Sequence, residues 1–439
     1  MSSSDHLQSI VKDQHNGKAS GIYSICSANR YVIEASMMQA KADGSLVLIE
    51  STSNQVNQFG GYTGMTAADF VKYLADIARH VQFDSKKIIL GGDHLGPNAW
   101  QKEAAKPAVE KALELVRSCV RAGYTKIHLD ASMRCADDPG GKHTPLSEET
   151  VTMRAAEMCA AAETAFKELP PGSPAPVYII GTEVPVPGGE QADHAGIAVT
   201  KIEDAERTIA ISKDAFFKRG LQQAWERVIG VVVQPGVEFG DNTVFPYNRE
   251  KARALSKTIE KYGKIVFEAH STDYQTPQAL RELVEDHYAI LKVGPWLTFA
   301  LREAVFALAE IEKEWLAGKI GVRLSRIREV LEEVMLENPG HWKPYYQGDE
   351  AYIAYARKFS FSDRSRYYWP QPKLDAALNT LIANLTAHPA PLTVISQFLP
   401  RQYDQIRAGR IANDPTALMH SKVMEVTQCY SRACGMVKD

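Results

Sequence analysis

Short apolar runs alternate with amphipathic stretches from about residue 20 to about residue 315 of the chain. The runs predict β-strands at residues 21–26, 46–50, 87–90, 126–130, 177–182, 228–233, 264–269 and 289–293. Several are continuously apolar, such as Val-Ile-Gly-Val-Val-Val at 228–233. This pattern is typical of strands that are buried on both faces of a parallel sheet.

Between these runs, apolar side chains recur every three or four residues, which predicts helices. In the stretch at 101–122 they are Val109, Ala112, Leu113, Val116 and Val120. Further helices are predicted at residues 29–40, 66–80, 147–167, 202–219, 249–262, 277–287 and 297–317. A series of strands that are each followed by a helix favours a closed (β/α)8 barrel over an open doubly wound sheet.

After about residue 318 the strand pattern fades while helical patterns continue. Residues 327–336, 373–386, 391–398 and 417–429 are predicted to be helices. We therefore expect an α/β protein with a TIM barrel at residues 1–317 and a helical C-terminal extension at residues 318–439 that packs on the barrel.

The composition narrows the class of protein. The chain has 439 residues and a formal net charge of -3, so neither nucleic acid nor a membrane surface is expected as a partner. We find no secretory signal and no apolar stretch of membrane-spanning length, which favours a cytoplasmic location. The six cysteines form no C-x-x-C pair, and reduced thiols are expected.

Titratable residues follow most of the predicted strands, whose carboxyl ends face a common mouth in a barrel. They are Asp93, His94, Asp130, Glu183, Glu268 and His270. A buried carboxylate is costly unless it is paired or bound to a cation, so this group indicates a cation site. Asp93 and His94 would point apart in a regular strand, so a turn at Gly91-Gly92 or Gly96-Pro97 is needed to bring both inward.

Structural roles remain open for several of these residues. His94 could be a hydrogen-bonded core histidine, Glu183 could hold a loop amide, and Asp130 could cap a helix or turn. His128 alternates with Asp130 and should face the same side. It lies deeper, however, where packing alone would explain it.

The candidate substrate-binding residues lie mostly in the loop after the second strand, whose amides and hydroxyls suit a sugar. They are Glu50, Ser53, Asn54, Gln55, Asn57, Gln58, Tyr62, Asn98 and Gln234. The usual phosphate position of a barrel, after strands seven and eight, predicts a second group. It comprises Ser271, Thr272, Lys292 and Gly294. Arg364 and Arg366 could clamp a phosphate in bidentate fashion, or pair with acids where the extension meets the barrel.

Six segments of the chain, taken together, resemble one known family. They are residues 49–64, 91–98 (Gly-Gly-Asp-His-Leu-Gly-Pro-Asn), 126–132, 181–189, 268–275 and 291–295. They look like the GatZ/KbaZ family, whose members are called D-tagatose-1,6-bisphosphate aldolase non-catalytic subunits or, in older naming, tagatose-6-phosphate kinases. The resemblance runs from about residue 21 to near the carboxyl terminus.

The resemblance carries expectations about the site. The family is similar to the class II aldolases, which are metal-dependent barrels with three histidine ligands and an aspartate for proton transfer. The resemblance implies that Asp93 transfers protons, and Asp130 and Glu183 are our further candidates for catalytic acids. No histidine is present at 182–183, where the aldolases have a ligand. The implied metal ligands are His94, Glu183, Glu268 and His270, a set that would accept Mg²⁺, Mn²⁺ or Zn²⁺.

Two functions follow as the main hypotheses. One is a metal-dependent ketohexose-6-phosphate 4-epimerase, which interconverts D-tagatose 6-phosphate and D-fructose 6-phosphate by retro-aldol and aldol steps, in carbohydrate metabolism such as galactitol catabolism. The other is a non-catalytic subunit that stabilises a class II tagatose-1,6-bisphosphate aldolase. A homo-oligomer and a true aldolase that releases trioses also remain open. The absence of a glycine-rich phosphate loop after any strand argues against a kinase.

Overall fold

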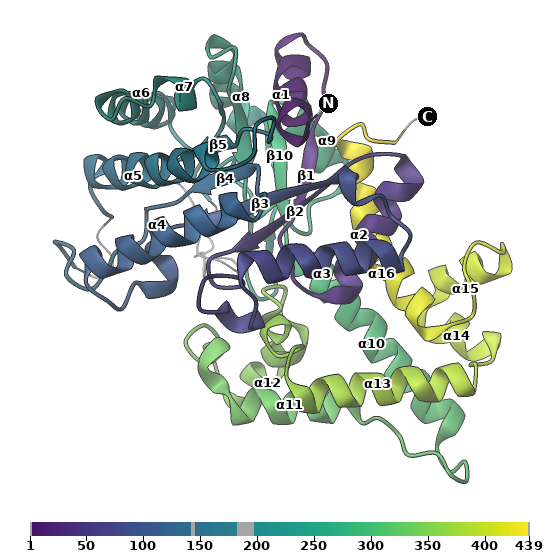
Figure 1. Cartoon of the computed structure of the whole chain (residues 1–439). Helices are drawn as coiled ribbons and strands as arrows, with labels where there is room; N and C mark the ends of the chain where they lie inside the picture. The colour runs from purple at the N-terminus through teal and green to yellow at the C-terminus, as the bar shows by residue number, and fades with distance from the viewer. Residues whose placement is uncertain (1, 142–144, 182–196, 438–439) are drawn as a thin grey trace.

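A computed structural model of the protein describes residues 2–141, 145–181 and 197–437. Parallel strands close a barrel in the order β1-β10-β9-β6-β5-β4-β3-β2 (Figure 1). The strands are β1 (Ile22–Ile25), β2 (Val47–Thr52), β3 (Ile88–Leu95), β4 (Lys126–Leu129), β5 (Val177–Ile180), β6 (Val228–Val233), β9 (Val266–Ala269) and β10 (Tyr288–Val293). The predicted TIM barrel is confirmed, and each predicted strand matches one of these within a few residues.

Helices surround the barrel. They are α2 (Arg30–Asp43), α3 (Ala67–His80), α4 (Ala105–Arg121), α5 (Glu148–Lys167), α6 (Ile202–Lys218), α7 (Gln222–Trp225), α8 (Arg249–Thr258), α9 (Pro277–Glu285) and α10 (Pro295–Leu316). Local signals fix their starts. Thr66 and Asp69 form a capping box at α3, and α9 and α10 begin with proline, which tolerates the first helical position.

One helix that the sequence analysis did not predict closes the amino-terminal end of the barrel. It is α1 (Ser3–His15), which begins with a capping box formed by Ser2 and Asp5. Leu7, Ile10 and Val11 of α1 pack against residues of the strands in a separate apolar cluster. The end of the barrel opposite the mouth is therefore plugged by apolar side chains.

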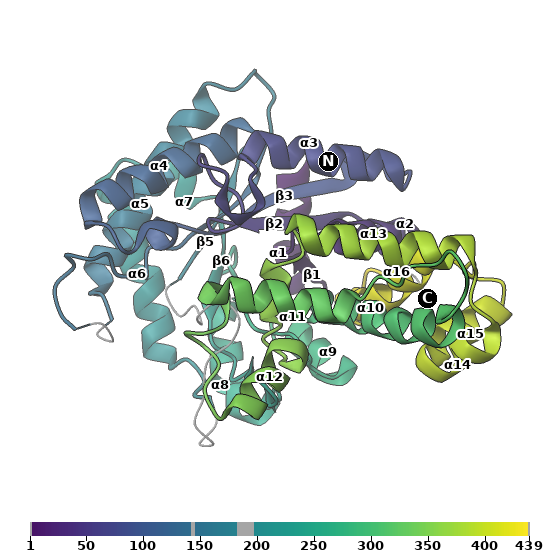
Figure 2. The same cartoon turned by 90° about the horizontal axis from the view of Figure 1, so that it is seen from below.

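The C-terminal extension is helical, as predicted. It contains α11 (Ile327–Glu337), α12 (Glu350–Phe359), α13 (Pro372–Ala387), α14 (Leu392–Phe398), α15 (Pro400–Arg407) and α16 (Pro415–Ala433), of which α12 and α15 were not predicted. In Figures 1 and 2 these helices gather beside α10, and α16 returns to pack against α2, α9 and α10. One apolar core includes residues of both parts, while a domain boundary at residue 317 remains a prediction.

None of the described helices combines the length and the apolar character that a membrane span requires. All six cysteines have free thiols.

Candidate active site

Charged side chains meet inside the barrel, below its mouth. The Lys126 Nζ atom lies 2.7 Å from both Glu50 Oε1 and Glu268 Oε2, and all three side chains are fully buried. Lys292 forms an ion pair with Glu50 and lies 3.0 Å from Asp93 Oδ1. Glu50 and Lys292, which the sequence analysis assigned to sugar and phosphate, therefore bind each other from β2 and β10, the two strands that flank β1.

A local irregularity in β3 brings Asp93 and His94 to the same site. His94 has a φ of 48°, in the left-handed region that few residues other than glycine adopt. The register of β3 against β4 also shifts between Gly92 and Leu95. The turn that we predicted at the flanking glycines thus lies at His94 itself, and strain of this kind is typical of functional sites.

The neighbouring glycines provide room instead. A Cβ atom on Gly91 would stand 2.6 Å from Glu50 Cγ, and one on Gly96 would stand 1.6 Å from the carbonyl oxygen of Asp130. Both distances are shorter than the contacts that Cβ atoms make in proteins, so a side chain at either position would force its neighbour to move. Gly91 therefore leaves room for the Glu50 side chain, and Gly96 lets the chain after β3 approach the backbone of Asp130.

Three imidazoles stand together at the inner end of the pocket. The ring centroids of His94, His128 and His270 lie 5.0–5.3 Å from one another. Each ring contacts a carboxylate: His94 with Asp130 at 2.9 Å, His128 with Asp93 at 3.1 Å, and His270 with Glu268 at 3.1 Å. His128, which the sequence analysis explained by packing alone, belongs to this cluster. Its alternation with Asp130 along β4 was the available signal.

These contacts fix the charges of the groups. Burial alone would raise the pKa of Asp93, but His94 and Lys292 outweigh it and hold the pKa well below its usual value. Burial opposes the protonation of His94, yet Asp93 and Asp130 raise its pKa overall. At His270 burial dominates and lowers the pKa to about 4. At neutral pH, Asp93 is therefore a carboxylate and His270 is a neutral imidazole that can bind a metal.

The donor atoms fit a divalent cation. Asp93, His128, Glu268 and His270 each offer an atom, and these atoms lie within 4.8 Å of one another. Opposite ligands of one ion stand up to roughly 4.6 Å apart, so donor atoms at this spacing need only small side-chain movements to share a cation. In addition, the Nε2 atom of His128 is buried without a hydrogen-bond partner among the described residues, an arrangement that a bound cation would satisfy.

The charge balance points the same way. In the part of the barrel that the structure describes, the buried carboxylates of this network are Glu50, Asp93, Asp130 and Glu268, and the buried ammonium groups are Lys126 and Lys292. After pairing with the two lysines, the carboxylates still carry two excess negative charges. The pKa of His94 is raised, so a proton on its ring offsets part of this excess. A divalent cation carries the complementary charge, and it would compete with the proton on His94.

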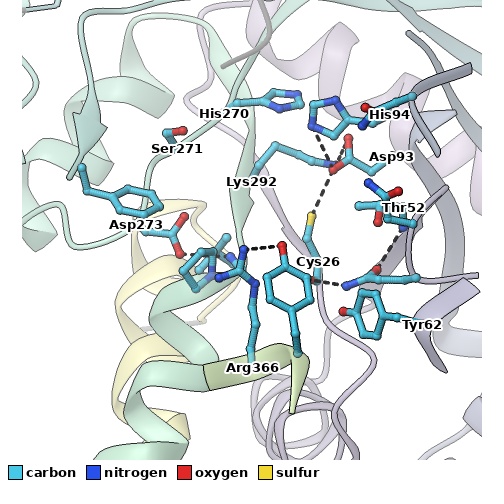
Figure 3. A pocket seen from close by; sticks show the side chains of 18 residues that line it. Cys26, Thr52, Tyr62, Asp93, His94, His270, Ser271, Asp273, Lys292 and Arg366 are labelled. Atoms are coloured by element: carbon cyan, nitrogen blue, oxygen red, sulfur yellow. Dashed lines mark hydrogen bonds and ion pairs between the residues drawn. The ribbon is translucent and has the colours of Figure 1, made fainter. Parts of the chain in front are cut away.

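A pocket opens above this cluster (Figure 3). The predicted residues that line it are Asn54, Gln55, Tyr62, Asp93, His94, Asn98, His270, Ser271, Lys292, Gly294 and Arg366. Cys26, Thr52, Asp273 and Tyr367 also line it and were not predicted. The pocket therefore combines residues of the strand ends, the loop after β2 and the C-terminal extension.

Several predicted sugar-binding residues form hydrogen bonds with the protein backbone instead. The Oδ1 atom of Asn57 accepts the amides of Phe59 and Gly61, and Gln58 donates to the Lys111 carbonyl. Gln234 Oε1 accepts two amides of its own turn. Ser53 is buried and does not line the pocket, and Glu183 lies outside the described residues.

The predicted phosphate-binding residues also separate. Thr272 is fully buried and donates to the Lys292 carbonyl. Arg364 stacks on Tyr345, 3.1 Å from the ring centroid, and donates to the His341 carbonyl. The structure therefore places Thr272 and Arg364 away from the pocket wall.

Arg366 does face the pocket (Figure 3). It belongs to a short 3-10 turn (Arg364–Tyr367), and Asp363, just before the turn, pairs with the buried Arg302 of α10 at 2.9 Å. Arg366 donates to the Asp363 carbonyl and to the Tyr367 hydroxyl. It has no ion pair with a carboxylate among the described residues, so its positive charge is available to an anionic ligand.

Asp273 occupies the position where a phosphate was predicted. Its Oδ1 atom accepts the amides of Gly294, at 3.0 Å, and Trp296, at 2.8 Å, at the start of α10. Burial raises the pKa of this carboxyl to about 6. The Gly294 amide, which we expected to bind phosphate, is thus already bonded to a carboxylate.

The chain is similar to a known protein family and to solved structures. Residues 7–435 match the family described as D-tagatose-1,6-bisphosphate aldolase subunit GatZ/KbaZ-like. A crystal structure of a probable tagatose 6 phosphate kinase from Sinorhizobium meliloti 1021 is 46% identical, with a TM-score of 0.86, over 94% of this chain and 100% of that one. A fructose-bisphosphate aldolase from Campylobacter jejuni is 14% identical, with a TM-score of 0.48, over 88% and 93%.

Proposed function

The chain belongs to the D-tagatose-1,6-bisphosphate aldolase subunit GatZ/KbaZ-like family, and from that premise we propose that it is a metal-dependent ketohexose-6-phosphate 4-epimerase. It would interconvert D-tagatose 6-phosphate and D-fructose 6-phosphate. One observation carries the proposal: the ionised Asp93 stands among three imidazoles at the inner end of a pocket that also presents the unpaired Arg366.

The chemistry of the substrate favours carbon–carbon cleavage. Carbon 4 is not adjacent to the C2 carbonyl, so its hydrogen is not acidic, and direct proton exchange cannot invert it. The C4 hydroxyl is, however, β to that carbonyl. Removing the hydroxyl proton breaks the C3–C4 bond, gives glyceraldehyde 3-phosphate, and leaves the electron pair on an enediolate of the three-carbon fragment. Re-addition to the other face of the aldehyde inverts C4.

Asp93 is the residue best placed for proton transfer. Its carboxylate is held ionised by His94 and Lys292, and it lines the pocket. It would take the C4 hydroxyl proton and return it after the aldehyde has turned. Asp130 accepts from Ser132 through one oxygen and contacts His94 through the other, so it would orient His94 rather than shuttle protons.

The residues that would hold the cation are His128, His270 and Glu268, and the predicted ligand His94 has its ring beside those of His128 and His270. When bound, the ion supplies Lewis-acid polarisation of the C2 carbonyl. Asp93, which also lies within reach of the same position, would remain beside it for proton transfer. Arg366 would hold the phosphate, and Asn54 and Gln55 on the pocket wall would hold sugar hydroxyls.

The mechanism is tested in deuterated water. Purified protein with Zn²⁺, Mn²⁺ or Mg²⁺ should convert tagatose 6-phosphate to fructose 6-phosphate without deuterium at C4, because the C4–H bond never breaks. No nicotinamide cofactor should be needed. If no fructose 6-phosphate forms with any of the three metals, the proposed function is wrong. Deuterium at C4 of the product would exclude the retro-aldol mechanism.

A second candidate function rests on the family description, which speaks of an aldolase subunit. In that case the chain would stabilise a separate class II aldolase without turnover of its own. Co-purification with an aldolase whose activity collapses when this chain is removed, together with no epimerisation by the chain alone, would favour it. Accumulation of free trioses would instead indicate a true aldolase.

A further inference from the structure

The start of α10 is the position at which this pocket would most readily bind an anion. The helix is 22 residues long, and its first amides point toward the mouth of the barrel. Helix N-termini favour negative charge, and barrel enzymes often bind phosphate at this position. Here the carboxylate of Asp273 takes the amides of Gly294 and Trp296 instead.

Asp273 is held firmly in that place. Its side chain is only 2% exposed. The segment around it is fixed on both sides, since Thr272 donates to the Lys292 carbonyl and the Tyr274 hydroxyl donates to the Phe361 carbonyl at 2.6 Å. Ser271 and Tyr274 both have positive φ angles. A phosphate would therefore have to displace a carboxylate whose backbone is locked.

The positively charged side chains of the pocket differ in whether a carboxylate already pairs with them. Among the described residues that line it, the lysine and arginine side chains are Lys292 and Arg366. Lys292 is already paired with Glu50 and Asp93, whereas Arg366 donates only to carbonyl and hydroxyl oxygens. The described part of the pocket thus offers one cation to a phosphoryl group and presents a carboxylate at the other favourable position.

We infer that Asp273 is a specificity-determining residue, which restricts the pocket to ketohexoses with one phosphoryl group and excludes the 1,6-bisphosphates. The inference rests on the proposed function and deepens it. A second phosphate would lose the two amides to Asp273 and would be repelled by its charge. An uncharged C1 hydroxyl suffers neither effect and can donate a hydrogen bond to the carboxylate.

The test is direct binding, which needs no turnover. Calorimetric titration of the metal-loaded protein should show that tagatose 6-phosphate binds at least about 100-fold more tightly than tagatose 1,6-bisphosphate, because hydrogen bonds to charged groups contribute about 10- to 100-fold each. In Asp273→Ser the amides become free, and this ratio should fall by at least about 10-fold. Asp273→Asn keeps the shape, removes the charge, and should give a smaller fall.

Asp349→Asn is the matched control. Asp349 also caps a helix, since it accepts the Tyr352 amide at the start of α12, but it does not line the pocket. The ratio of the affinities for tagatose 6-phosphate and tagatose 1,6-bisphosphate should be the same in Asp349→Asn as in the wild type. A thermal melt shows whether Asp273→Ser is folded. If it is not, the binding ratio of Asp273→Asn alone tests the inference.

The outcomes separate this inference from the proposed function. If the wild type epimerises tagatose 6-phosphate yet binds the bisphosphate equally well, or if neither Asp273 variant changes the ratio, the inference is wrong and the function stands. If the wild type neither binds nor converts the monophosphate, both are overturned.

Discussion

The Nζ atom of Lys292 lies 3.0 Å from Oδ1 of Asp93, although the two residues stand on strands β10 and β3 of the barrel. This contact helps to keep Asp93 ionised, and the carboxylates around Lys292 hold the pKa of its ammonium well above the usual value, although burial opposes this. A lysine that stays protonated cannot form a Schiff base with a ketose. The geometry therefore favours cation-assisted over lysine-based carbon–carbon chemistry.

The buried charge network should be essential for folding. Lys126→Met removes the ammonium group that lies 2.7 Å from both Glu50 and Glu268, and the cost should be about 3–5 kcal/mol of unfolding free energy. Lys373→Met is the matched control, because Lys373 pairs with Glu333 and Glu337 on the surface and such pairs contribute at most about 1 kcal/mol. Urea denaturation of both variants checks this. Equal losses of unfolding free energy in Lys126→Met and Lys373→Met would contradict the assigned role of Lys126.

The two arginines of the segment before α13 should differ in function. Arg366→Met removes the unpaired charge at the pocket, and the KM for tagatose 6-phosphate should rise by about 10- to 100-fold. Arg364→Met removes a guanidinium that stacks on Tyr345 outside the pocket, so its KM should change little once folding is confirmed. Steady-state kinetics on both variants test this difference in KM. A raised KM in Arg364→Met with an unchanged KM in Arg366→Met would assign the phosphate to Arg364 instead.

Metal binding should depend on His128, the imidazole that the sequence analysis left as packing. His128→Gln should lower the affinity for Mn²⁺ or Zn²⁺ by at least about 10-fold. His420→Gln is the control, because His420 is also buried and bonded to a carboxylate, Glu34 at 2.8 Å, but outside the pocket. Calorimetric metal titration gives the comparison. An unchanged affinity in His128→Gln would exclude His128 as a ligand.

His270 should make the metal-free protein sensitive to acid. Burial lowers its pKa to about 4, whereas the unfolded chain binds a proton here near pH 6.5. Between these values the unfolded state binds more protons, so stability falls as the pH decreases, by on the order of 3 kcal/mol. His270→Asn should flatten this slope in chelator-treated protein, and His80→Asn, at an exposed position, should leave it unchanged. A slope unaffected by His270→Asn would contradict the assignment.

The fold could be predicted from the sequence because burial on both faces leaves continuous apolar runs, as in β6. Local patterns also predicted that Asp93 and His94 reach the mouth. The helix α1 was missed, although Ser2 and Asp5 have capping-box spacing, because its apolar residues are few: Leu7, Ile10 and Val11.

Pairing across the barrel could not be predicted. Glu50 and Lys292 lie 242 positions apart, and nothing in their local sequences shows that they face each other. The same holds for Asp273, which caps α10 from a different loop. Each of these residues was either assigned to a ligand or overlooked, because its partner is set by tertiary structure alone.

The proposed function requires the buried cluster to be a metal-dependent active site within a single chain. The decisive measurement is the rate of fructose 6-phosphate formation from tagatose 6-phosphate by the purified chain, during titration of chelator-treated protein with Mn²⁺ or Zn²⁺. We predict that activity returns in proportion to metal up to one equivalent, and that Asp93→Asn binds the metal but is at least about 100-fold slower. Full activity in the presence of chelator, or none until a second aldolase chain is added, would contradict it.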